Sequence, residues 1–217
     1  MMWNLLGCFG IGDSAPVIDS NFEPSVVLAD VGMTFGHNTS NNTLAGWHLK
    51  GEEVHRFEPN GDGRIIAASP SSTGVVLVAE NSGGSQRQLW WGSESGWTTG
   101  ANLAHGPISQ LLVSKNGTIW TEGDAGVHRS TDKGETWTRM ELSNDLNLGA
   151  IKLGEHENRV VFAGRNLMAS TDNGENWSVI YPGKVSTTDG EWVAEQTESS
   201  GLRIGRIRAS GVEWTAN

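Results

Sequence analysis

The apolar residues of this chain gather in short runs that are separated by Gly, Pro, Ser and Asn. The runs at residues 75–79, 108–113 and 159–163 are typical, and each contains Val, Ile or Leu in adjacent positions. No long window repeats its apolar positions with the period of a helix. Short apolar runs bounded by turn residues predict β-strands, so the pattern predicts an all-β fold.

The predicted strands fall into groups of four. In the third group they occupy residues 108–113, 118–121, 127–129 and 137–140, with a hairpin sequence at Asn116-Gly117. The fourth group repeats this order, whereas the first strand of the last group is poorly marked. About five four-stranded units predict a small β-propeller, which five blades are enough to close. The predicted blades are at about residues 25–58, 64–99, 107–142, 148–181 and 183–217.

One eight-residue pattern, S-x-D-x-G-x-x-W, occurs twice, at residues 130–137 and 170–177. Its defining residues are Ser130, Asp132, Gly134 and Trp137, then Ser170, Asp172, Gly174 and Trp177. A short carboxylate can accept hydrogen bonds from the backbone N–H groups of its own turn. Glycine supplies the positive φ that a tight turn needs, and the tryptophan covers the next hydrophobic layer. These roles are structural, so we expect the aspartates to form turns and not to act as catalytic acids.

The spacing of tryptophans extends this signal beyond two copies. Trp137 and Trp177 are 40 positions apart, and Trp97 lies another 40 positions upstream. Trp214 follows Trp177 by 37 positions, and Gly211 precedes Trp214 as Gly134 precedes Trp137. Trp97, Gly211 and Trp214 therefore mark degenerate repeats. A fixed period of this size indicates a propeller, a solenoid or an array.

The repeated pattern resembles the Asp-box, or bacterial neuraminidase repeat, of β-propellers such as sialidases. The resemblance implies a tight turn between the third and fourth strands of a blade. It does not extend to the sialidase active site, which needs three arginines, a tyrosine nucleophile with a glutamate partner, and an aspartate acid. Tyr181 is the single tyrosine, and Arg203-Ile204-Gly205 is a poor substitute for the R-I-P context of that family. We therefore expect no catalytic residue, because a fold does not carry activity with it.

The composition of the chain limits which partners and cofactors we expect. The formal net charge of −10 repels phosphate backbones, so we expect no nucleic-acid partner. A single cysteine, Cys8, excludes an internal disulfide framework. The six histidines show no metal-ligand spacing, and no nucleophile elbow or phosphate loop is present. We expect neither a metal nor another cofactor.

Paired carboxylates are the chemistry that glycosidases use. The candidates for such a pair are the carboxylates of Glu80, Glu94, Glu122 and Asp124. We expect them to be solvated turn residues. Adjacent Trp90 and Trp91 must point to opposite faces of one strand, so one of them can offer a platform to a glycan or receptor. Packing of both between blades is the favoured alternative.

Residues 1–24 form a predicted apolar arm that precedes the propeller at 25–217. The arm lacks the basic start of a signal peptide and is too short to span a bilayer. Its apolar side chains are Trp3, Leu5, Leu6, Phe9 and Ile11. A free monomer would leave them wet, so we expect the arm to anchor the propeller to other protein subunits. A ring-closing strand is the alternative.

Three classes of function remain. We favour a non-catalytic structural or interaction propeller in a larger assembly, because of the apolar arm and the absence of a signal peptide and disulfides. A glycan-binding or receptor-binding propeller is the alternative, and a glycoside hydrolase of sialidase type is less favoured. Small Asp-box propellers of this kind resemble those of tailed-bacteriophage virions. That resemblance implies a virion protein assembled in the host cytoplasm, with a cytoplasmic or extracellular location as the alternative.

Overall fold

The computed structural model of the chain describes residues 21–28, 32–41, 43–50, 53–57, 61–93, 96–140, 152–197 and 201–215. These residues form 20 strands in five four-stranded antiparallel sheets, and none of them is helical. The predicted all-β fold with five four-stranded blades is therefore confirmed. The predicted anchor residues Trp3, Leu5, Leu6, Phe9 and Ile11 lie outside the described residues, as do Cys8 and Glu94.

Each blade consists of four consecutive strands. Blade 1 contains β1 (Phe22–Leu28), β2 (Met33–Asn38), β3 (Thr43–Lys50) and β4 (Glu53–Phe57). Blade 2 contains β5 (Arg64–Ser71), β6 (Gly74–Glu80), β7 (Arg87–Ser93) and β8 (Gly96–Asn102). Blade 3 contains β9 (Ile108–Val113), β10 (Ile119–Gly123), β11 (Gly126–Ser130) and β12 (Thr138–Arg139). Blade 4 contains β13 (Lys152–His156), β14 (Arg159–Ala163), β15 (Leu167–Ser170) and β16 (Ser178–Tyr181). Blade 5 contains β17 (Thr187–Thr188), β18 (Trp192–Thr197), β19 (Gly201–Arg208) and β20 (Gly211–Trp214).

The first strand begins earlier than the sequence indicated. Because β1 starts at Phe22, residues 22–24 pair with β2 in blade 1, although the sequence predicts them as part of the arm. Pro24 lies beside a register shift in this pairing, where a missing backbone N–H is tolerated.

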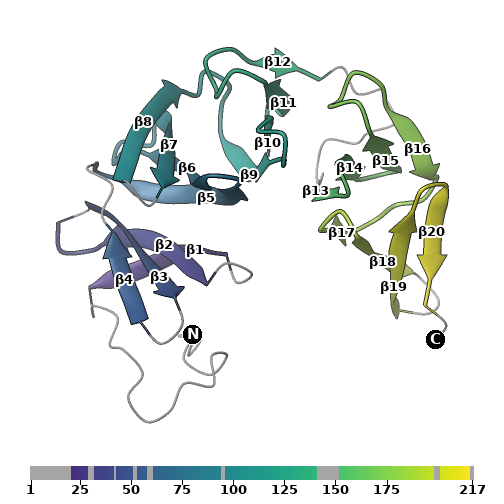
Figure 1. The fold of residues 1–217 in the computed structure, drawn as a ribbon, viewed down its shortest axis with the longest axis horizontal. Coiled ribbons are helices and arrows are strands. Elements are labelled where there is room, and N and C mark those ends of the chain that lie inside the picture. The colour runs from purple at the N-terminus through teal and green to yellow at the C-terminus, as the bar shows by residue number, and fades with distance from the viewer. Residues whose placement is uncertain are drawn as a thin grey trace, which may run out of the picture.

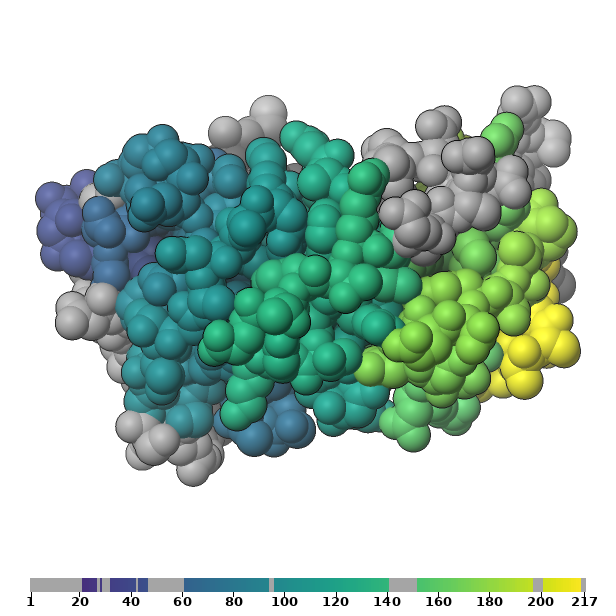
Figure 2. Space-filling model, turned by 90° about the horizontal axis from the view of Figure 1, so that it is seen from above, coloured from purple at the N-terminus to yellow at the C-terminus, as the bar shows by residue number. Residues whose placement is uncertain are grey.

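The blades form a curved row in chain order. Their first strands contact one another in sequence, β1 with β5, β5 with β9, β9 with β13, and β13 with β17. Figure 1 shows these strands on the inside of the curve and β8, β12, β16 and β20 on the outside. From above, the colours likewise follow one another from purple to yellow along the molecule (Figure 2). Each blade between the ends therefore packs against two neighbours.

The described strands do not close into a ring. Blade 1 and blade 5 lie apart on the open side of the arc (Figure 1). Among the described strands, those of blade 1 make no substantial contact with those of blade 5. The face of blade 5 that points away from blade 4 is therefore left without a following blade in the described part of the chain.

Four hydrophobic cores lie between successive blades. Strand β6 shows how one blade serves two of them, because alternate side chains point to opposite faces. Val75 and Leu77 pack with Phe35 of blade 1, whereas Val76 and Val78 pack with blade 3. The cores between blades 3 and 4 and between blades 4 and 5 are built in the same way.

Polar contacts join the inner strands of neighbouring blades. The backbone N–H of Val113 donates to the hydroxyl of Ser69, 2.8 Å away. The side-chain amide of Gln110 donates to the carbonyl of Leu153 at 2.9 Å and accepts from its N–H at 2.8 Å. These contacts satisfy backbone groups that would otherwise face the gap between two sheets.

Candidate functional site

The first repeated turn, residues 130–137, is closed by its own side chains. The Ser130 hydroxyl donates to Asp132 at 2.7 Å and accepts from the N–H of Gly134 at 2.8 Å. Asp132 also accepts from the backbone N–H and the hydroxyl of Thr136, at 2.9 Å and 2.5 Å. The indole N–H of Trp137 donates to the carbonyl of Gly134 at 3.0 Å. The turn lies between β11 and β12, the third and fourth strands of blade 3.

The second repeated turn, residues 170–177, has the same geometry between β15 and β16. Gly174 donates to the Ser170 hydroxyl at 2.7 Å, and Asp172 accepts from the N–H of Asn176 at 2.9 Å. Trp177 donates to the carbonyl of Gly174 at 3.0 Å. In both turns the residue before the glycine has a positive φ of 61° and the glycine has one of 85–89°. Glycine meets this backbone requirement without strain.

The glycine of each turn also lies against the preceding blade. A Cβ added to Gly134 would meet the Leu89 side chain of blade 2 at 2.2 Å. One added to Gly174 would meet the Trp120 ring of blade 3 at 2.3 Å. The repeated turns are therefore docked elements, and each one packs onto the blade that comes before it.

An arginine of blade 3 holds the second turn in place. Arg129, on β11, donates to the carbonyl of Asn173 at 2.6 Å. Its guanidinium also lies 2.7 Å from the carboxylate of Glu175. Trp120 and Arg129 are cross-strand partners on β10 and β11, so they face blade 4 together. They form a receptor that contacts the glycine, the residue before it and the residue after it.

Four tryptophans of the 40-residue pattern each reach one inter-blade core. Trp97, Trp137, Trp177 and Trp214 pack against the cores between blades 1 and 2, 2 and 3, 3 and 4, and 4 and 5 respectively. Trp177 stacks on Phe162 with ring centroids 4.1 Å apart. The turn before Trp214 differs, because Gly211 begins β20 directly after the two-residue turn at 209–210. Its tryptophan nevertheless reaches the equivalent core.

The turn aspartates are held in their ionised form. Hydrogen bonds from the Thr136 hydroxyl, the Thr136 N–H and the Ser130 hydroxyl lower the pKa of Asp132 to about 2. The N–H and side-chain amide of Asn176, followed by Ser170, lower the pKa of Asp172 to about 2. Such carboxyl groups cannot donate a proton near neutral pH.

Trp90 and Trp91 both lie between blades. Trp90 is buried in the core between blades 1 and 2, and Trp91 packs against the core between blades 2 and 3. The rings point to opposite faces of β7, as its alternation predicts. Trp90 has no exposed face for a glycan in this structure.

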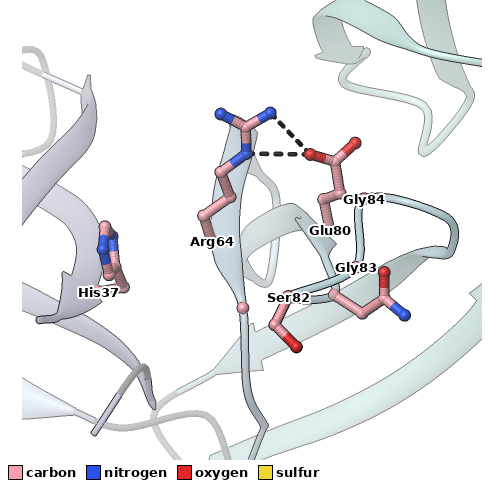
Figure 3. A pocket seen from close by; sticks show the side chains of 8 residues that line it. His37, Arg64, Glu80, Ser82, Gly83 and Gly84 are labelled. Atoms are coloured by element: carbon pink, nitrogen blue, oxygen red, sulfur yellow. Dashed lines mark hydrogen bonds and ion pairs between the residues drawn. The ribbon is translucent and has the colours of Figure 1, made fainter.

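A polar hollow of about 340 Å³ opens between blades 1 and 2. It is lined by His37, Gly63, Arg64, Glu80, Asn81, Ser82, Gly83 and Gly84. Figure 3 shows His37 on the neighbouring blade, apart from the linked pair Arg64 and Glu80. The loop from Ser82 to Gly84 forms the remaining wall in that view. The hollow presents the exposed guanidinium of Arg64 beside backbone groups.

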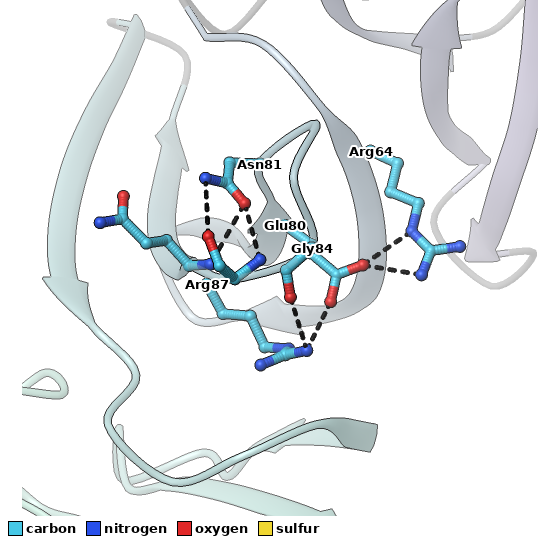
Figure 4. A network of polar contacts seen from close by, with 7 residues as sticks. Arg64, Glu80, Asn81, Gly84 and Arg87 are labelled. Carbon is cyan, nitrogen blue, oxygen red and sulfur yellow. Dashed lines mark hydrogen bonds and ion pairs between the residues drawn. The ribbon is translucent and has the colours of Figure 1, made fainter.

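Glu80 lies between two arginines at the edge of this hollow (Figure 4). Its carboxylate accepts from Arg64 at 2.7 Å and from Arg87 at 2.6 Å. Burial alone raises the pKa of Glu80, but the hydrogen bonds and charges of Arg64 and Arg87 outweigh burial and lower it. Both carboxylate oxygens are occupied, so Glu80 is poorly placed to act as a general acid or base.

The expectation that these carboxylates are solvated turn residues is wrong for Glu80 and Glu122. Each is only 6% exposed, and Glu122 accepts a hydrogen bond from the Ser109 hydroxyl. Arg64, Glu80 and Arg87 are cross-strand neighbours on β5, β6 and β7, so hairpin register was the signal that could have found them. Asp124 is exposed in its turn, as expected.

The described residues also contain two further polar clusters. The His105 and His128 rings stack with centroids 4.0 Å apart, and His105 Nε2 is 2.7 Å from the Thr121 hydroxyl. Burial, followed by the charge of His128, lowers the pKa of His105 to about 4.

The second cluster joins blades 4 and 5. The hydroxyl of Tyr181 lies 3.2 Å from both oxygens of Glu195, and Arg203 donates to that hydroxyl at 2.6 Å. The Arg203 guanidinium also lies 4.0 Å from the ring centroid of Trp214. Sequence reasoning did not bring these groups together, because they come from four strands of two blades. Their mutual contacts make the cluster a polar clamp between the blades.

Blade 5 exposes apolar side chains on the face away from blade 4. Val193 and Ile207 point into the core with blade 4, so their neighbours along β18 and β19 point outward. Trp192 is 40% exposed, Leu202 58% and Ile204 47%. Trp192, Ile204 and Leu202 lie on one face of the paired strands β18 and β19. We call Trp192, Leu202, Ile204 and Arg206 the outer face of blade 5.

The described residues contain no group of three or more His, Cys, Asp or Glu residues that is arranged to hold a metal ion. No long apolar helix of the kind that crosses a bilayer occurs in the described part of the chain either.

Three solved structures resemble this fold. The GH74 enzyme of Niastella koreensis matches with a TM-score of 0.55 and 15% identity, over 90% of this chain and 30% of the enzyme. YCF48, solved with a D1 peptide, matches with a TM-score of 0.53 and 13% identity, over 92% of this chain and 68% of YCF48. The Dos1 propeller matches with a TM-score of 0.54 and 12% identity, over 89% of this chain and 56% of that one. No protein-family model matches the sequence, and comparison with curated proteins finds no match.

These identities are too low to carry more than the fold, and the chain spans only part of each neighbour. The likeness nevertheless agrees with the architecture described above, in which five four-stranded antiparallel sheets follow one another around a curve. The chain is therefore a β-propeller domain.

Proposed function

We propose that this propeller is a non-catalytic structural or interaction subunit of a larger assembly. The observation that carries the proposal is the outer face of blade 5, where Trp192, Leu202 and Ile204 remain exposed at the open end of the arc. Burial of the exposed part of these side chains would remove apolar surface from water, which favours a partner on this face. YCF48, a propeller of similar fold, was solved with a bound peptide, and this supports a protein-binding role.

The polar groups of the described residues support a role without catalysis. The carboxylates of Asp132 and Asp172 are used within their own turns, and that of Glu80 is held by two arginines. The Tyr181 hydroxyl is held between Glu195 and Arg203. A catalytic acid or base needs a titratable group that is free to exchange a proton with a substrate. These contacts favour stabilising roles for all four groups.

The repeated turns support a more specific form of this proposal. Their hydrogen bonds and their place between third and fourth strands support the assignment of residues 130–137 and 170–177 as Asp boxes. The assembly that we favour is a tailed-bacteriophage virion. In it, this chain would be a small Asp-box propeller that is assembled in the host cytoplasm. The apolar arm, with Trp3, Leu5 and Phe9 among its residues, is then a second attachment to neighbouring subunits.

Isolation from the native source tests this proposal. A chain tagged at its C-terminus is expected to co-purify in fixed stoichiometry with one assembly, and deletion of residues 2–20 is expected to reduce its incorporation. The isolated chain is expected neither to hydrolyse a fluorogenic sialoside nor to bind a glycan array. Sialoside turnover would establish the hydrolase, and selective glycan binding would establish the lectin. A chain that remains monomeric and unassembled in its native source would contradict the proposal.

A further inference from the structure

Blade 5 repeats the receptor with which blade 3 holds a repeated turn. On blade 3, Trp120 of β10 is the cross-strand partner of Arg129 of β11. On blade 5, Trp192 of β18 is the cross-strand partner of Arg206 of β19. Both pairs lie on the face that points away from the preceding blade. The second and third strands of the two blades thus present the same two side chains in the same arrangement.

The blade 3 pair shows what such a receptor holds. The Trp120 ring lies against Gly174, where there is no room for a side chain. Arg129 contacts the carbonyl of Asn173 and the carboxylate of Glu175, which flank that glycine. This contact leaves Trp120 0% exposed and the Arg129 side chain 14% exposed.

The equivalent pair on blade 5 is uncovered. Trp192 is 40% exposed, and the Arg206 side chain is 42% exposed. The Arg206 guanidinium lies 5.6 Å from the centroid of the Trp192 ring and 2.6 Å from the carboxylate of Glu191. Glu191 thus takes the place that Glu175 has at Arg129, and Ile204 and Leu202 extend the apolar surface beside the ring.

We infer that Trp192 and Arg206 form a docking site for a glycine turn on a β-sheet of a partner protein. The glycine of the partner lies on the Trp192 ring. The carbonyl before that glycine and an acidic side chain after it bind Arg206 in place of Glu191. The site requires a tight turn of the D-x-G-E kind, because a residue with a Cβ would clash with the ring.

A second copy of this chain is a poorer occupant. Its turns at residues 130–137 and 170–177 already lie against Leu89 and Trp120 of their own preceding blades. Neither can reach another copy unless a core between blades is opened. The inference rests on the proposed function, since it names the surface and the kind of partner through which this propeller joins an assembly.

A labelled hairpin is the direct probe. It carries residues 167–181 of this chain, whose ends are cross-strand partners, and is closed by a disulfide between added terminal cysteines. Closure is needed because an isolated two-stranded hairpin is marginal in water. Fluorescence anisotropy with the full chain is expected to show saturable binding. Trp192→Ala and Arg206→Ala are each expected to raise Kd about tenfold or more.

Matched controls distinguish binding at this site from nonspecific binding. Arg208→Ala removes another exposed arginine of β19, and Val179→Ala removes another exposed apolar side chain, so both are expected to bind the probe like the parent chain. A probe with Gly174→Val is expected to lose binding. Equal melting temperatures of the variants establish that each protein is folded.

Three results would overturn the inference. They are failure of the parent chain to bind the probe, binding by the Trp192→Ala and Arg206→Ala variants that is as tight as that of the parent chain, and self-association that Trp192→Ala abolishes. Incorporation into the native assembly distinguishes this failure from failure of the proposed function. If the Trp192→Ala chain assembles normally, the assembly role stands and this docking site is wrong. If the parent chain never assembles, the proposed function is wrong.

Discussion

At the scale of single residues, this fold depends on glycines that lie against a neighbouring blade. Gly174 combines a φ of +85° with an approach to Trp120 that excludes a side chain. Gly117 has nearly the same φ, +86°, but no atom lies within 4 Å of the position of its Cβ. A comparison of these two positions therefore separates the stability cost of backbone strain from the cost of the clash with Trp120.

Gly174→Ala is expected to destabilise the protein more than Gly117→Ala. Both variants bear the cost of a left-handed conformation, about 1–2 kcal/mol. Only Gly174→Ala also forces the turn away from Trp120, and overpacking of this kind costs about 1–3 kcal/mol more. Urea unfolding of the two variants measures the difference. Equal losses would contradict the docking of the turn on Trp120.

Folding stability is expected to fall as the solution becomes mildly acidic. The folded-state pKa of His105 is about 4, against an ordinary value of 6.5. As pH falls through this interval, the unfolded chain binds a proton that the folded chain does not, so the free energy of unfolding decreases. Burial and Arg139 lower the pKa of His128 as well, which acts in the same direction.

His105→Gln is expected to make this pH dependence shallower. Urea unfolding at several pH values between 6.5 and 4 measures the slope for both proteins. An unchanged slope would show that His105 does not resist protonation in the folded chain.

At the scale of strands and turns, the sequence was most informative where a side chain has one local role. The S-x-D-x-G-x-x-W pattern located both turns, because serine and aspartate bind amides within the same few residues. The same sequence did not reveal Arg64, Glu80 and Arg87 as one network. Their contact depends on the register of two hairpins, and a one-residue change of register moves a side chain to the other face.

Three tryptophans that differ in burial test the inter-blade cores. Trp177→Ala removes a ring that stacks on Phe162 and contacts Trp120, and should cost about 3–5 kcal/mol. Trp137→Ala should cost a similar amount in the preceding core. Trp192→Ala alters an exposed ring and should change stability by about 0.5 kcal/mol or less. Melting curves of the three variants measure these losses of stability. A Trp192 variant as unstable as the Trp177 variant would contradict this ranking.

At the scale of the whole molecule, the number of blades was predictable but the open arc was not. Strand count follows from the alternation of apolar runs and turns along the chain. Closure depends on the angle between neighbouring sheets, which follows from the packing of cores such as that around Trp120 and Phe162. Local sequence patterns carry little information about that angle.

An arc of blades is expected to unfold unevenly. Each blade packs only against its neighbours, so the stability of the arc resembles a sum of blade and interface contributions. Blade 5 has one described interface, whereas blade 3 has two. Native-state hydrogen exchange read by mass spectrometry should therefore show β18 and β19 opening at lower free energy than β10 and β11. A single opening free energy for the whole chain would contradict this expectation.

The docking of each turn on the blade before it has a consequence for biosynthesis. Leu89 precedes residues 130–137 in the chain, and Trp120 and Arg129 precede residues 170–177. Every receptor is therefore translated before the turn that it holds. Because a nascent chain folds from its N-terminus, each contact can form as soon as its turn leaves the ribosome. The chain can thus assemble blade by blade during translation, with blade 4 formed on blade 3 as soon as its turn emerges.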